Sequence, residues 1–383
     1  MRPSGSRGGR ARGVAPDDGR NIDPTVGVLE GEGSDQEVPE RRALAEGTAP
    51  FAVWGETSSP DRQRAAATQE PTYYGRPVLK EPVWIWAVPA YFFTGGVAGA
   101  AAVLGASAQS STRDELDGLI RRCRWIAAAG ATVGTGLLIY DLGRPERFLN
   151  MLRVFRPTSP LNVGSWIVAA AGPLTVVSAI LSGGEGVLGT LGDTAGSAAG
   201  AVGLPLAGYT AVLVSSTAVP VWSEIRRSLP VLFVASAVEG AAGLLQLLKL
   251  NAREESVARR FAVAGAAADL AAAAAVEQEA ARVTGVDAAL REGLAGSLLR
   301  AAKALAASSL ALNLLPGRAR WKRTVAGVVG VLGSLATKFG VFYAGQASAR
   351  DPRASFRLQR AGRGAAEVTG RSAVTGPDER ATR

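Results

Sequence analysis

Long apolar stretches are the feature of this sequence that most constrains its fold. Between Val83 and Ala344, about eight windows hold roughly 20 mostly apolar residues each, the length that a membrane-spanning helix needs. Lipid offers no water to backbone groups, so such segments form helices or a closed barrel, and the lack of period-2 alternation excludes the barrel. We therefore predict an all-α integral membrane protein with about eight transmembrane helices, arranged as two four-helix bundles. The expected spans are Val83–Ala108, Cys123–Tyr140, Val163–Leu181, Val202–Val221, Leu229–Leu250, Ala258–Val276, Leu298–Leu315 and Thr324–Ala344.

Polar segments flank these windows at both ends of the sequence. They are rich in Gly, Arg, Glu, Ser and Pro, a composition that buries too little surface to offset chain entropy. We expect disordered tails over residues 1–72 and 349–383 and a membrane domain over residues 73–348. Basic residues beside the spans number about 17 on the side of the termini and about 12 on the other, which favours cytoplasmic termini.

The sequence contains no His and one Cys, Cys123. Haem in a membrane bundle usually needs His ligands, and an iron–sulfur cluster usually needs several Cys ligands. We therefore expect no haem and no metal in this chain, and we expect Cys123 to be a small apolar packing residue. The formal charge of +9 lies largely in loops and tails beside apolar helices, so anionic lipid headgroups are a more plausible partner than nucleic acid.

Three stretches carry a resemblance to a known family. The first is YYGRPVLKEPVW (73–84), which leads into YFFTGG (91–96); the second is YDLGRPERFLNMLRVFRPTSPLNVGSW (140–166). The third is YTAVLVSSTAVPVW (209–222), supported by KFGVFYAG (338–345). Together they resemble the NrfD / polysulfide reductase membrane-subunit family, in the actinobacterial form associated with formate-dehydrogenase-like complexes.

The resemblance implies an eight-helix, haem-free subunit in the bacterial plasma membrane. Such a subunit exchanges electrons between a membrane quinone, here menaquinone, and a partner, and it catalyses nothing alone. The implied partners are a four-cluster, ferredoxin-like iron–sulfur subunit and, beyond it, a molybdopterin catalytic subunit. Proton translocation is a further possibility for such a subunit.

The turn after the second expected span is the first candidate site. One interpretation is a helix stop, with Gly143 as the left-handed cap and Pro145 preventing continuation. The other interpretation is a quinone site. Reduction of a quinone needs protons at the two carbonyl oxygens of the quinone. Tyr140, Asp141 and Arg144 would bring a phenol, a carboxylate and a guanidinium together for this purpose.

Two residues near the first expected span are further candidates, for proton delivery to the quinone or for contact with its headgroup. These are Glu81 and Tyr91. Alternatively, Glu81 is an acid just before a helix whose first turn contains Pro82, where it would interact favourably with the helix dipole. Trp84, Trp86, Trp166 and Trp222 lie near expected helix ends, and we interpret all four as interfacial anchors.

Charged residues inside expected spans point to function, because a carboxylate in lipid is costly. Glu239 lies near the middle of the fifth span and Asp269 within the sixth, and we interpret both as candidates for proton transfer. Alternatively, they are neutral or paired with Lys303 or Lys338. Two other functions stay open for the chain as a whole, a secondary transporter and a purely structural membrane anchor.

Overall fold

The computed structural model describes residues 79–111, 113–143, 145–283, 286–317, 319–351 and 354. The predicted tail over residues 1–72 lies outside the described residues, as does most of the predicted tail over residues 349–383. Within the described part, the secondary structure is helical throughout. The described residues therefore belong almost entirely to the predicted membrane domain.

Eight long helices and three short ones make up the described chain. The long helices are α3 (Ala87–Ser111), α4 (Arg113–Asp141), α5 (Pro160–Ile180), α6 (Gly186–Ser215), α8 (Leu229–Leu247), α9 (Ala252–Ala280), α11 (Gly293–Leu314) and α12 (Arg320–Arg350). The short ones are the 3₁₀ helix η2 (Pro145–Leu152), α7 (Pro220–Glu224) and α10 (Ala288–Arg291).

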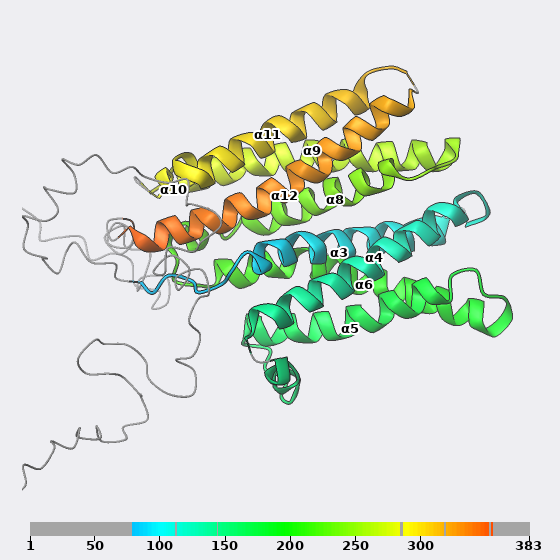
Figure 1. The fold of residues 1–383 in the computed structure, drawn as a ribbon, viewed down its shortest axis with the longest axis horizontal. Helices are drawn as coiled ribbons and strands as arrows, with labels where there is room; N and C mark the ends of the chain where they lie inside the picture. The colour runs from blue at the N-terminus through cyan, green and yellow to red at the C-terminus, as the bar shows by residue number, and fades with distance from the viewer. Residues whose placement is uncertain are drawn as a thin grey trace, which may run out of the picture. The chain divides into compact units, whose positions relative to one another are not determined.

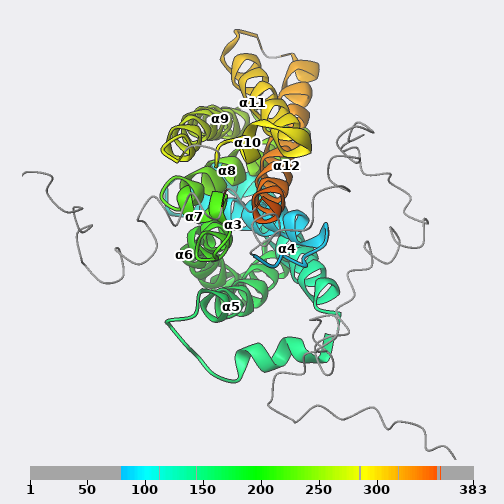
Figure 2. The same ribbon diagram turned by 90° about the vertical axis from the view of Figure 1, so that its left-hand side faces the viewer.

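The long helices pack as two groups of four, as the sequence predicts. Helices α3 to α6 form the first group, and α8, α9, α11 and α12 form the second. Helices α3 and α6 contact α8, and α12 contacts α3, so the two groups share an interface (Figures 1 and 2). Chain direction alternates along each group, which brings the start of α3, the end of α4 and the end of α12 to one end of the helices.

Six of the described helices are long and apolar enough to cross a membrane: α3, α5, α6, α8, α9 and α12. The all-α membrane fold is therefore confirmed. Helices α4 and α11 run beside these six but carry charges that lower their apolar character, for example Arg121, Arg122 and Lys303. The count of eight spans stays a prediction.

Helix α6 differs from the sequence-based expectation. The expected spans Val163–Leu181 and Val202–Val221 leave the Gly-rich residues 182–200 outside any span, but α6 begins at Gly186 and ends at Ser215. The expected start at Val202 was wrong because packing outweighs the low helix propensity of glycine. The first turns of α6 are held by Arg124, whose Nη2 lies 2.8 Å from Oδ1 of Asp193, and by Gln109, whose Nε2 donates to the Asp193 carbonyl.

Glycines allow α3 to approach its neighbours closely, as small residues do in bundles of membrane helices. A Cβ on Gly203 of α6 would lie 2.6 Å from the carbonyl oxygen of Gly99 on α3. On the other side of α3, a Cβ on Gly130 of α4 would lie 2.8 Å from the Thr94 carbonyl oxygen. Any larger residue at Gly203 or Gly130 would push α3 and its neighbour apart.

Trp222 corrects one of the anchoring assignments. Its side chain is fully buried, and its indole Nε1 donates a 2.9 Å hydrogen bond to the Val341 carbonyl of α12. A Cβ on Gly345 would overlap with the Trp222 ring. Trp222 is thus a core residue that joins α7 to α12, whereas Trp86 and Trp166 are partly exposed, as interfacial anchors are.

Candidate functional site

The DLGRP segment ends α4 as the helix-stop interpretation predicts. Helix α4 ends at Asp141, and Gly143 has a φ of +66°, the left-handed conformation that glycine adopts readily at such a position. The 3₁₀ helix η2 follows. Arg144 lies outside the described residues, so its part in the candidate site remains a prediction.

The SPLN segment starts α5 and secures the loop that precedes it. Ser159 is the N-cap, and its side chain accepts from the backbone N–H of Asn162, while Pro160 occupies the first turn. The Asn162 side chain donates to the Met151 carbonyl at 2.9 Å and accepts from the Arg156 N–H at 2.6 Å. This motif therefore fixes the path of the chain from α4 to α5.

Asp141 lies against the segment that leads into α3. Its Oδ1 accepts a 3.2 Å hydrogen bond from the backbone N–H of Ile85. Asp141 follows the expected span and is half-buried, and this burial raises its pKa above the usual range, an effect that the hydrogen bond from Ile85 partly opposes. The Asp141 carboxyl group is therefore a group that would hold a proton more readily than a surface aspartate.

Two partly exposed aromatic rings lie beside Asp141. The ring of Tyr140 is 6.2 Å from that of Trp86 between centroids, and these residues are 63% and 47% exposed. The structure thus brings Tyr140, Asp141 and Trp86 to one place, with a phenol, a carboxyl group and two partly exposed aromatic side chains. We call Trp86, Tyr140 and Asp141 the helix-end cluster.

Glu81 binds the C-terminal end of α12. The Arg350 guanidinium donates to both Glu81 oxygens, with distances of 2.9 Å from Nε and 2.5 Å from Nη2. Helix α3 begins only at Ala87, so the expectation that Pro82 lies in its first turn was wrong. The segment before α3 is instead held by its contacts with Asp141 and Arg350.

Tyr91 lies deeper and is paired with a residue that sequence reasoning missed. Its hydroxyl group is hydrogen-bonded to that of Tyr209 on α6. Gly134 of α4 packs against the Tyr91 ring, because a Cβ added to Gly134 would lie 3.1 Å from Cδ2 of Tyr91. Gly134 lies about 10 Å before Asp141 along α4. Tyr91 is therefore buried beneath the helix-end cluster rather than within it.

The three sequence stretches that carry the resemblance meet at this tyrosine pair. Tyr91 comes from the first stretch and Tyr209 from the third, and a Cβ on Gly164 of the second would overlap with the Tyr209 ring. The signal for Tyr209 was thus present in the sequence, because it begins the third stretch. Its role could not be derived there, because nothing in the spacing relates Tyr209 to Tyr91.

Glu239 and Asp269 lie inside the second group of helices, on α8 and α9. Both are 1% exposed, and both oxygens of Glu239 and Oδ1 of Asp269 have no hydrogen-bond partner among the described residues. Gly265 and Gly330 leave room for Glu239, because a Cβ on Gly265 would lie 2.7 Å from its backbone nitrogen and one on Gly330 would lie 3.5 Å from its Cγ.

Lys338 of α12 completes this group, which we call the buried charge cluster (Glu239, Asp269 and Lys338). The carboxylate of Asp269 is near enough to interact electrostatically with both Glu239 and Lys338. The Lys338 Nζ donates a 2.8 Å hydrogen bond to the Phe233 carbonyl and lies 3.8 Å from the centroid of the Phe233 ring. Lys303, the other candidate partner, instead forms an ion pair with Glu277.

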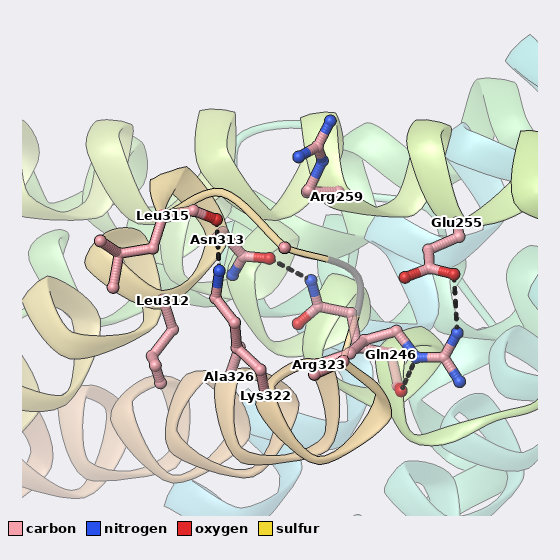
Figure 3. Close-up of a pocket in the computed structure, with 11 residues that line it drawn as sticks. Gln246, Glu255, Arg259, Leu312, Asn313, Leu315, Lys322, Arg323 and Ala326 are labelled. Atoms are coloured by element: carbon pink, nitrogen blue, oxygen red, sulfur yellow. Dashed lines mark hydrogen bonds and ion pairs between the residues drawn. The ribbon is translucent and has the colours of Figure 1, made fainter.

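A small pocket lies at the opposite end of the second group from the helix-end cluster (Figure 3). Its basic side chains bind helix ends: Arg323 donates to the carbonyls of Gln246 and Leu248 at the end of α8, and Lys322 donates to those of Leu315 and Pro316 after α11. The pocket measures about 30 Å³, too little for a quinone headgroup. We therefore interpret it as a capping cluster.

No group of three or more Cys, Asp or Glu side chains suited to a metal ion lies among the described residues. The cavities described in the structure lie away from the helix-end cluster. A molecule bound at this cluster would therefore lie against the open faces of Trp86 and Tyr140. The ring faces and the carboxyl group suit a flat aromatic headgroup with polar oxygens.

A family model described as Polysulphide reductase, NrfD matches residues 78–191, from the segment before α3 to the first turns of α6. The resemblance predicted from the sequence is confirmed over this part, which is less than half of the chain. It covers the helix-end cluster and Tyr91, whereas Tyr209 and the buried charge cluster lie beyond it. No curated protein matches the chain.

Proposed function

We propose, from the similarity of residues 78–191 to the NrfD family, that this chain is the quinone-reactive membrane subunit of a multi-subunit oxidoreductase. A role as a membrane anchor follows from the family match and the apolar helices together. The finer proposal is that electrons pass between menaquinone and an iron–sulfur partner subunit, itself bound to a molybdopterin catalytic subunit. The bacterial plasma membrane and cytoplasmic termini are parts of the same proposal.

The observation that carries the proposal is the helix-end cluster, which lies within the matched residues. Menaquinone, when bound, would supply the exchange of two electrons and two protons. Tyr140 and Trp86 would orient its ring through their exposed faces, and the Tyr140 hydroxyl would donate a hydrogen bond to a carbonyl oxygen. Asp141 would hold and deliver a proton, with its orientation fixed by the Ile85 N–H.

Three further predicted residues have different parts in this proposal. Glu81 would position the cluster indirectly, because its ion pair with Arg350 holds the segment that contains Ile85 and Trp86. Tyr91, paired with Tyr209, would form a hydroxyl relay beneath the headgroup. Arg144, three positions after Asp141 in the sequence, would supply a positive charge to the site.

Proton transfer through the second group of helices is the other part of the proposal. Buried carboxylates without hydrogen-bond partners are costly, so they are seldom kept without a function. Glu239 and Asp269 would exchange a proton, and Lys338 would stabilise the ionised form of Asp269 by its positive charge. These residues lie outside the part that matches the family.

The experiment that tests the proposal is purification of the tagged native protein in a mild detergent. Mass spectrometry identifies the proteins and lipids that copurify, and an optical spectrum reports haem. We expect an iron–sulfur protein, menaquinone in near-stoichiometric amount and no haem band. A protein without quinone and without redox partners would contradict the proposal and favour transport, whereas redox partners without quinone would favour a purely structural anchor.

A further inference from the structure

A groove of about 390 Å³ lies between α3, α4 and α9. It lies at the end of the helices opposite the helix-end cluster, beside the end of α3 and the starts of α4 and α9. Leu104, Leu116 and Val257 form its apolar part. Ser107 contributes a hydroxyl group from α3, while the charged side chains come from α9.

One face of α9 gives this groove its positive charge. Arg253, Ser256 and Arg260 are spaced three and four residues apart, so they lie along one side of the helix. Arg253 forms an ion pair with Glu115, with 3.2 Å between Nε of Arg253 and Oε2 of Glu115. Arg260 is exposed and forms no ion pair with any described residue, so the groove contains a guanidinium without a counter-ion.

Aromatic residues on α4 indicate the depth of the groove relative to a membrane. Trp125 is 53% exposed and lies about 22 Å along the helix from Tyr140, on the side of the groove, and exposed Trp side chains are typical of a membrane–water interface. Gly105 of α3 packs against Cys123, two residues before Trp125, because a Cβ added to Gly105 would lie 3.1 Å from the Cβ of Cys123. The groove begins at Leu104, beside Gly105, and extends away from Tyr140, so it lies at headgroup level.

The geometry points to a binding site for the headgroup of an anionic phospholipid, such as phosphatidylglycerol, in this groove. The guanidinium groups of Arg260 and Arg253 bind its phosphate, and the Ser256 hydroxyl donates to it. The glycerol backbone and the first methylene groups lie against Leu104, Leu116 and Val257. Since α3 and α4 belong to one group of four helices and α9 to the other, this lipid joins the two groups.

Free phosphate shares the charge but not the apolar part of such a lipid, which makes the two ligands distinguishable. The test uses the full-length protein, purified in mild detergent and stripped of lipid. It is then exposed to phosphatidylglycerol, phosphatidylcholine or inorganic phosphate. Native mass spectrometry counts the lipid that remains bound, and thermal melting reports stabilisation.

The matched pair of variants is Arg260→Gln and Arg259→Gln. Both remove one exposed arginine from the same turn of α9, but only Arg260 lines the groove, whereas Arg259 lines the pocket of Figure 3. We expect the wild-type protein and R259Q to retain phosphatidylglycerol in preference to phosphatidylcholine, and R260Q to bind it about fivefold more weakly.

Three results would overturn the inference. Equal losses in R259Q and R260Q would show that net charge rather than the groove is responsible. Equal retention of phosphatidylglycerol and phosphatidylcholine by the wild-type protein would show that the groove does not select an anionic headgroup. This measurement does not depend on the folding of any variant. Stabilisation by inorganic phosphate equal to that by phosphatidylglycerol would identify a site for free anions.

Discussion

The backbone N–H of Ile85 donates a 3.2 Å hydrogen bond to Oδ1 of Asp141, although 56 residues separate them. This bond fixes the last residue of α4 against the segment that leads into α3. The rings of Trp86 and Tyr140, the residues next to Ile85 and Asp141 in the sequence, lie 6.2 Å apart and are partly exposed. The helix-end cluster is thus held together by a hydrogen bond between the Asp141 side chain and the backbone of a distant segment.

Asp141→Asn separates the two tasks of this residue, because an amide oxygen still accepts from Ile85 but cannot deliver a proton. In the complete oxidoreductase complex we expect quinone turnover to fall at least tenfold, within the range of general acid–base effects, with little change in melting temperature. The control is Glu146→Gln, which removes an exposed acid from η2 in the same turn. Equal turnover in D141N and the wild type would exclude Asp141 as the proton donor.

The ion pair between Glu81 and Arg350 should make a small but measurable contribution to stability. Arg350 binds both oxygens of Glu81, but its side chain is 64% exposed, so solvent screens the interaction. A double-mutant cycle with E81Q and R350Q should give a coupling energy of about 0.5–1 kcal/mol from chemical or thermal unfolding. The control pair is Arg253 and Glu115, whose side chains are 65% and 59% exposed and should show coupling near zero. Strictly additive effects for Glu81 and Arg350 would contradict this prediction.

The sequence predicted the kind of fold and the first half of the candidate site, because both depend on local signals. Apolar runs predict helices in lipid, and Gly143 predicts the end of α4 through its left-handed conformation.

The rest depends on contacts between segments far apart in the sequence. The start of α6 at Gly186 could not be predicted, because its Gly-rich turns are stabilised by α3 and by Arg124. The burial of Trp222 and its contact with Gly345 had no local signal either. Likewise, only the fold shows that Asp269 neighbours Lys338 rather than Lys303.

Gly345→Ala tests the packing of Trp222. The added methyl group would overlap with the Trp222 ring, which is fully buried and tied to Val341, so it cannot move away cheaply. We expect a destabilisation of about 2–3 kcal/mol or a loss of folded protein, measured by thermal melting and size-exclusion chromatography. Gly136→Ala is the control, because an added Cβ there meets nothing within 4 Å and alanine favours the helix. A G345A protein as stable as the wild type would contradict this packing.

Glu239→Leu should separate stability from function in the buried charge cluster. Both carboxylate oxygens of Glu239 lack a hydrogen-bond partner among the described residues, so an apolar side chain removes a desolvated polar group. We expect E239L to raise the free energy of unfolding by about 1–3 kcal/mol. In vesicles that contain the complete complex, we also expect it to abolish the proton movement that accompanies quinone turnover.

Glu279→Leu is the matched change for E239L in the same group of helices. Glu279 is 7% exposed, but its Oε2 accepts from both the backbone N–H and the hydroxyl of Ser228, at 3.0 and 2.5 Å. Its replacement leaves the buried Ser228 N–H without this acceptor and the Ser228 hydroxyl with only a long 3.4 Å hydrogen bond to the Ile225 carbonyl, so it should lower stability by about 1–3 kcal/mol. We expect the two variants to change the free energy of unfolding with opposite signs, because both glutamate side chains are buried but only that of Glu279 is hydrogen-bonded. If E239L lowered stability as much as E279L does, Glu239 would be a structural residue, and its assignment to proton transfer would lose its physical basis.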